Sequence, residues 1–148
     1  MSAALASRAL AERGRANAAF FEAESERLAR LCHRMAERFA RGGRLVAFGH
    51  TPADRSDARH VAVEFVHPVI VGKRALPALG LAGEGGPVEA QLALLAEPGD
   101  IVIGFGRRAA KGLALARERG CLTIGFAPDE AEWAFVPPTE DEYVAQEL

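Results

Sequence analysis

Short apolar segments alternate with helix-like stretches along most of this chain, and this alternation constrains its fold more than any other feature. The apolar segments are residues 44–49, 75–81, 100–104 and 121–126, with a weaker one at 133–136. The stretches with helical character between them are residues 56–66, 88–95 and 107–119. Strands that are apolar throughout and separated by helices build parallel sheets from βαβ units. We therefore expect an α/β protein with a doubly wound parallel sheet of four to five strands, of Rossmann or flavodoxin type.

A long helical segment precedes the first strand. Residues 3–41 are rich in Ala, Glu, Arg and Leu, and a Gly pair follows. Phe21, Leu28 and Met35 recur every seven residues and form one apolar stripe. We expect Gly14 to divide the segment into two helices. The stripe is wider than one small sheet can cover, which favours burial against another subunit.

We accordingly predict an oligomer-forming helical segment at 1–41 and a single α/β domain at 42–148, assembled as a homodimer or homotetramer. The chain has 148 residues, of which 49% are hydrophobic and 26% charged, so it can bury a core. Its 18 basic and 20 acidic residues weigh against a nucleic-acid partner. No apolar run is long enough for a membrane span, and the first residues do not resemble a signal peptide. These features predict a cytoplasmic protein with neither a nucleic-acid nor a membrane partner.

Ligands of doubly wound folds bind beyond the carboxyl ends of the strands, so the loops at these ends are the places to inspect. The loop after the third strand reads Gly104-Phe105-Gly106-Arg107-Arg108-Ala109, a GxGxxA pattern at the start of a helix. Such a turn can hold a phosphate through backbone amides, and Arg107 and Arg108 add positive charge. A nucleotide site and a tight turn with a solvated Arg pair are both compatible with this pattern.

The segment from Gly49 to Pro68 carries the most chemical information. We expect a helix that begins near Ser56 or Asp57 and runs to Pro68. On it His60, Glu64 and His67 share one face, because they are four and three residues apart. An imidazole and a carboxylate at this spacing can bind a divalent cation, with Zn²⁺ as the first choice. A histidine hydrogen-bonded to a neighbouring carboxylate on a solvated face is the alternative.

The order and spacing of five blocks resemble the sugar isomerase (SIS) domain family, and most of all its phosphoheptose isomerase branch. The blocks are RGGRLVAFGH, DARHVAVEF, RALPALGL, GDIVIGF and ARERGCLTIGFA, and the final VAQEL resembles the start of the family's last helix. DARHVAVEF is the most specific match. The resemblance covers roughly residues 16 to 148 and implies an isomerase of sedoheptulose 7-phosphate that is usually tetrameric.

The resemblance also implies a set of site residues. His60, Glu64 and Gln146 match three zinc ligands, and Glu64 matches the catalytic acid–base group. The family's fourth ligand, a His, would fall about two helical turns after Gln146, beyond Leu148, so His67 is an alternative ligand. For the phosphate of the substrate we expect Thr51, Ser56, Arg107 and Arg108.

Two loops depart from the family pattern. The GNGGS turn after the first strand is replaced by residues 49–53, which include Pro52, and the STSGNS loop is replaced by the shorter residues 105–108. We therefore expect a sugar-phosphate-binding or regulatory subunit with lost or weak isomerase activity, which could act on a protein partner. The alternatives are an active metal-dependent sedoheptulose 7-phosphate isomerase and a nucleotide-binding domain.

Overall fold

The computed structural model of the chain describes residues 3–81, 83–128 and 131–145. These residues divide into two compact units: one holds the first helix up to Leu31 together with the chain from Val136, and the other runs from Cys32 to Phe135. The helices are α1 (Ala3–Ala40), α2 (Pro52–Val66), α3 (Val88–Leu95), α4 (Ala110–Glu118) and α5 (Glu142–Ala145). The strands are β1 (Leu45–Gly49), β2 (Ala78–Gly80), β3 (Ile101–Phe105), β4 (Leu122–Gly125) and β5 (Trp133–Ala134).

The described strands form one five-stranded sheet in the order β2-β1-β3-β4-β5, and every neighbouring pair is parallel. The predicted fold class is thus confirmed. The chain moves from β1 to β2 in one direction and then crosses back over β1 to β3. This reversal places the topological switch point between the carboxyl ends of β1 and β3, where open α/β sheets bind ligands.

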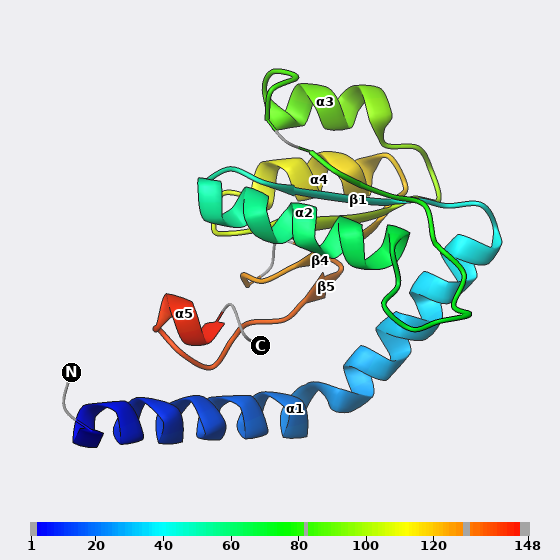
Figure 1. The fold of residues 1–148 in the computed structure, drawn as a ribbon. Helices are drawn as coiled ribbons and strands as arrows, with labels where there is room; N and C mark the ends of the chain where they lie inside the picture. Colours follow the sequence, from blue (N-terminus) through cyan, green and yellow to red (C-terminus); the bar gives the residue numbers. More distant parts are fainter. Residues whose placement is uncertain (1–2, 82, 129–130, 146–148) are drawn as a thin grey trace. The chain divides into compact units, whose positions relative to one another are not determined.

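Helices cover the two faces of the sheet, which explains why its central strands are apolar throughout (Figure 1). Every residue of β1 and of β4 is buried. α2 packs on one face, and α3 and α4 lie side by side on the other. The core under α3 and α4 includes Phe48, Leu92, Val102 and Leu113, all with no exposed surface.

Glycines let helix α4 approach this core closely. A Cβ on Gly112 would lie 2.7 Å from Cζ of Phe48, and one on Gly104 would lie 2.8 Å from Cβ of Ala109. The first glycine of the GxGxxA pattern is therefore explained by packing between β3 and α4, without a ligand.

Several predicted boundaries were wrong. α1 is one continuous helix of 38 residues through Gly14, because a single exposed Gly costs a helix only about 1 kcal/mol relative to Ala. β2 has three residues instead of seven, since it is an edge strand preceded by Pro77, which has no N–H to donate. α2 starts at Pro52, four or five residues earlier than the expected start at Ser56 or Asp57. Among the described helices, none is long and apolar enough to cross a membrane.

Candidate functional site

The carboxyl ends of β1 and β3 lie side by side at the switch point, where Gly49 pairs with Phe105. The loop after β1 leads directly into α2, and the loop after β3 leads through residues 106–109 into α4. We call the position where these two loops meet the switch-point crevice, because ligands of open α/β sheets bind at this position. Its two sides come from segments about fifty residues apart in the sequence, joined by the pairing of β1 with β3.

A capping box shapes the β1 side of the crevice. The Thr51 hydroxyl accepts a hydrogen bond from the Asp54 backbone N–H at 3.2 Å, and the Thr51 N–H donates to Oδ2 of Asp54 at 3.0 Å. Pro52 occupies the first helical position, where a missing N–H costs nothing. These reciprocal bonds start α2 at Pro52 and fix the Asp54 carboxylate at the mouth of the crevice.

The Asp54 side chain is fitted between two glycines. A Cβ on Gly106 would lie 2.5 Å from Cγ and from both carboxylate oxygens of Asp54, and a Cβ on Gly49 would overlap Cβ of Asp54. Gly106 also has a φ of +78°, a left-handed conformation that glycine adopts readily. The second glycine of the GxGxxA pattern therefore accommodates a carboxylate of this same chain.

A histidine–glutamate pair lies beside the capping box. Nε2 of His50 is 3.4 Å from Oε1 of Glu89, at the start of α3, and both side chains are largely buried. Nδ1 of His50 is buried and has no hydrogen-bond partner among the described residues. A backbone N–H bond at the start of α3 and the contact with His50 together outweigh burial and lower the pKa of Glu89. The carboxylate form of Glu89 is thus favoured next to His50.

His60 and Glu64, the predicted metal ligands, lie on the outer surface of α2. Nε2 of His60 is 3.8 Å from Oε1 of Glu64, and the two side chains are 76% and 47% exposed. Gln146 lies outside the described residues. His67 is exposed at the C-cap of α2. In residues 3–81, 83–128 and 131–145, no group of three or more His, Cys, Asp or Glu side chains could hold a metal ion. The structure thus brings together two of the four residues considered for zinc.

The residues predicted for phosphate binding are divided between the crevice and the surface. Thr51 lies in the crevice, but its N–H and its hydroxyl oxygen are both engaged with Asp54. Ser56 is exposed on α2. Arg107 and Arg108 are exposed on the loop between β3 and α4, directly after Gly106. The loop on the β3 side of the crevice therefore carries two exposed arginines directly after Gly106.

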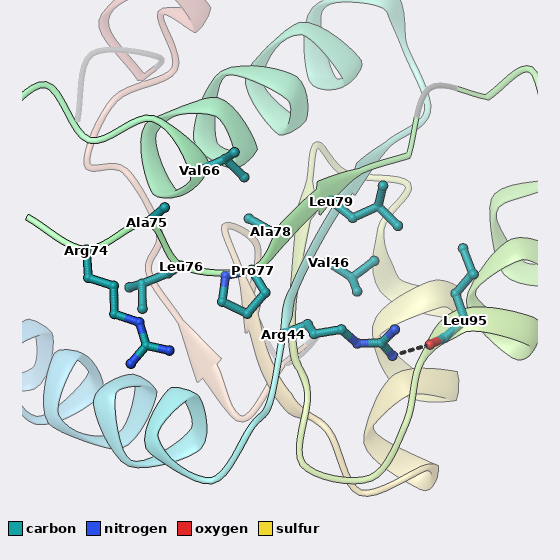
Figure 2. Close-up of a pocket in the computed structure, with 10 residues that line it drawn as sticks. All are labelled: Arg44, Val46, Val66, Arg74, Ala75, Leu76, Pro77, Ala78, Leu79 and Leu95. Carbon is teal, nitrogen blue, oxygen red and sulfur yellow. Dashed lines mark hydrogen bonds between the residues drawn. The ribbon is translucent and has the colours of Figure 1, made fainter.

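A cavity of about 560 Å³ lies at the other end of the sheet, by the amino ends of β1 and β2. Its lining residues are mostly apolar, with two arginines: Arg44, Val46, Val66, Arg74, Ala75, Leu76, Pro77, Ala78, Leu79 and Leu95. Figure 2 shows Arg44 reaching across it to the carbonyl oxygen of Leu95, at 2.7 Å. The cavity contains none of the residues predicted for the site and lies at the end of the sheet opposite the switch point.

Relatives and structural neighbours point to one family. No family model matches the chain. The phosphoheptose isomerase of Solidesulfovibrio magneticus is 31% identical over 134 residues, which cover 78% of this chain and 65% of that protein. A phosphoheptose isomerase from Francisella tularensis superposes with a TM-score of 0.81 at 15% identity, covering 99% of this chain and 92% of the other. One from Neisseria gonorrhoeae gives a TM-score of 0.78 at 18% identity, with coverages of 96% and 89%.

The chain is phosphoheptose isomerase-like in sequence and has the fold of the phosphoheptose isomerases. It spans 65%, 61% and 62% of the lengths of three curated phosphoheptose isomerases that it matches.

Three residues of this site were not assigned a functional role from the sequence: His50, Asp54 and Glu89. Asp54 carried a local signal, because Thr51 and Asp54 have the spacing of a capping box. The contact between Asp54 and Gly106 had no local signal in the sequence, because it depends on the pairing of β1 with β3. The contact between His50 and Glu89 had no local signal either, because it depends on where α3 packs.

Proposed function

We propose that this chain binds a phosphorylated sugar or a related carbohydrate derivative, and that its isomerase turnover is lost or slow. The likeness to phosphoheptose isomerases supports the ligand class. The residues that lie in the switch-point crevice support the loss or slowing of turnover. Asp54 fills its β1 side, and residues 105–109 on its β3 side include no hydroxyl group.

A crevice with these residues binds phosphate less well, and phosphate binding supplies the energy that orients the reacting carbons. We therefore expect turnover to be slowed. Arg107 and Arg108 can attract a phosphate electrostatically. A guanidinium does not titrate near neutral pH, so these residues can hold the ligand but cannot transfer a proton. We therefore expect weak binding of the ligand together with slow or absent isomerisation.

Glu64 is the group we propose for any remaining acid–base chemistry. Aldose–ketose isomerisation moves a proton between adjacent carbons and needs a carboxylate or imidazole that a substrate can reach. The Glu64 side chain is 47% exposed and lies beside His60, which meets this requirement. His60 and Glu64 supply a nitrogen and an oxygen donor suited to Zn²⁺, and Gln146 is the proposed third ligand. When bound, Zn²⁺ would polarise a substrate carbonyl.

The second candidate function is an active zinc-dependent isomerase of sedoheptulose 7-phosphate. The separation of 3.8 Å between His60 and Glu64 favours it, because both donors of the most specific motif are kept side by side. A nucleotide-binding function has no comparable support, since packing accounts for both glycines of the GxGxxA pattern.

One experiment separates the two candidates. Conversion of sedoheptulose 7-phosphate is followed by NMR with and without added Zn²⁺, for the wild type, Glu64→Gln and the control Glu84→Gln. We expect binding with turnover near background in all three proteins. Turnover of order one per second in the wild type, kept in Glu84→Gln and lost in Glu64→Gln, would establish the active isomerase instead.

The binding part has its own test. Isothermal titration with sedoheptulose 7-phosphate compares the wild type with Arg107→Ala and with Arg117→Ala, an exposed arginine in the last turn of α4. We expect weak binding that Arg107→Ala reduces and Arg117→Ala leaves unchanged. Equal binding by all three proteins would remove the loop after β3 from the proposed site.

The proposal includes a homo-oligomer that uses α1. On this helix Leu10 is 63% exposed and Phe21 is 43% exposed, and burying such side chains in an interface is favourable. Light scattering at micromolar concentration tests it, and Phe21→Glu is expected to shift the mass toward the monomer. A wild-type monomer would refute the interface and leave contact with a different protein as the role of α1.

A further inference from the structure

The switch-point crevice has the general features of an anion site. Both α2 and α4 begin there, and the amino end of a helix carries partial positive charge and N–H groups without helical partners. Helix starts at the carboxyl edge of a parallel sheet commonly bind the phosphate of a ligand for this reason. In this chain the carboxylate of Asp54 already lies there.

The structure shows that this carboxylate is built into the crevice. Asp54 takes the Thr51 N–H, which is one of the donors that an external anion would need. Its carboxylate rests against Gly106 so closely that a single Cβ on Gly106 would lie 2.5 Å from three of its atoms. A second anion has neither the space nor the donor at this position while the Asp54 carboxylate occupies it.

The charge of Asp54 adds electrostatic exclusion to this steric exclusion. Within the described ranges, Asp54 forms no ion pair with an arginine, lysine or histidine. A phosphate entering the crevice would therefore meet a carboxylate that no direct ion pair neutralises. Like charges a few ångströms apart in a partly buried site repel strongly.

We propose that Asp54 is a specificity-determining residue that acts as a built-in anion and closes the switch-point crevice to phosphate. A phosphorylated ligand then has to place its phosphate outside the crevice, by Arg107 and Arg108. The inference rests on the proposed function for its ligand class, and it names the residue that sets how such a ligand is held.

Inorganic phosphate is the probe that tests this inference. Its binding is measured by isothermal titration and by ligand-induced change in melting temperature, for the wild type, Asp54→Ala, Asp54→Asn and Thr51→Val. Asp54→Ala removes both the volume and the charge of the carboxylate. Asp54→Asn removes the charge and keeps the shape, so it also serves if Asp54→Ala folds poorly. Thr51→Val weakens the same capping box but leaves the carboxylate in place, which makes it the matched control.

We expect Asp54→Ala to bind phosphate at least about tenfold more tightly than the wild type, and Asp54→Asn to show a smaller gain, because only the charge is removed. Thr51→Val should lose stability without gaining phosphate affinity. Gly106→Ala in the Asp54→Ala background should abolish the gain, since its Cβ refills the vacated space.

Two results would overturn the inference: phosphate affinity unchanged in both Asp54 variants, or a gain of the same size in Thr51→Val. Failure of the proposed function is a different result, namely no binding of sedoheptulose 7-phosphate by the wild type. A wild type that fails to bind this sugar, with Asp54→Ala still gaining phosphate, would refute the proposed function and support the role of Asp54.

Discussion

Two aspartates lie at opposite ends of the same parallel sheet, and their surroundings differ. Asp100 precedes β3 at the amino end and is 2% exposed. Arg44 donates to both of its carboxylate oxygens, at 3.3 and 2.7 Å, and the backbone N–H groups of Arg44 and Glu97 donate at 2.8 and 3.1 Å. Asp54, at the carboxyl end, accepts the N–H of Thr51 and lies against Gly49 and Gly106.

The difference separates a structural carboxylate from one that lies at the switch-point crevice. Burial by itself would favour the neutral form of Asp100, but the bonds from Arg44 and Glu97 outweigh it, so the pKa of Asp100 lies below its usual value. The same contact raises the pKa of Arg44. This ion pair joins the starts of β1 and β3, and Arg44 also lines the cavity at the amino end of the sheet. Asp54 has no such partner among the described residues, and its position affects what the crevice can bind.

The largest effect is expected where the crevice is tightest. Gly106→Ala forces a Cβ against Asp54 at a φ of +78°, and we expect it to lower the free energy of unfolding by about 3 to 4 kcal/mol. Gly72→Ala is the control, because Gly72 has a φ of +83° with nothing within 4 Å of the added Cβ, and its cost should be about 1 kcal/mol. Urea unfolding measures both variants. Equal losses of stability in the two variants would mean that the Asp54 side chain can move away from the added Cβ at little cost.

The next effect concerns the amino end of the sheet. Asp100→Ala leaves Arg44 and two backbone N–H groups without their acceptor, and we expect a loss of about 3 kcal/mol. Asp54→Ala should cost only about 1 kcal/mol, as for a lost helix cap. Chemical unfolding of the two variants side by side tests the comparison. A larger loss for Asp54→Ala would reverse the assignment of structural and ligand-facing roles.

A smaller effect is expected from the capping box. Thr51→Val removes the hydroxyl that accepts the Asp54 N–H, and we expect it to destabilise the chain by about 1 kcal/mol. Ser56→Ala, an exposed substitution on the same helix, should change stability by less than about 0.5 kcal/mol. Thermal unfolding followed by circular dichroism distinguishes them. Indistinguishable melting temperatures would show that α2 does not depend on this cap.

The smallest effect is a difference in pH dependence. Because the folded-state pKa of Asp100 is lowered, its contribution to stability is present above the unfolded-state pKa of about 3.9 and is lost as the pH falls through the folded-state value. The wild type should therefore lose stability below about pH 4 more steeply than Asp100→Asn. Urea unfolding across this pH range measures how the free energy of unfolding changes with pH in the two proteins. Equal changes in both would show that Asp100 does not contribute to the loss of stability in acid.

The elements of the fold were predictable because their signals are local. The apolar runs at β1, β3 and β4 and the helical segments between them predicted a parallel sheet with helices on both faces. The i, i+4 spacing of His60 and Glu64 likewise placed both side chains on one face of α2, where the structure has them. The start of α2 was missed because Thr51, and not Ser56 or Asp57, makes the cap.

By itself, the sequence determined the order of the strands and helices but not all of their bounds, because side-chain periodicity and helix caps act over a few residues. It also determined the likeness to phosphoheptose isomerases through the spacing of its motifs. Only the tertiary structure decided that the carboxylate of Asp54 fills the space beside Gly106, and that His50 meets Glu89. Both contacts join segments far apart in the chain. The first exists because β1 pairs with β3 where the chain reverses direction, and the second exists because α3 begins beside His50.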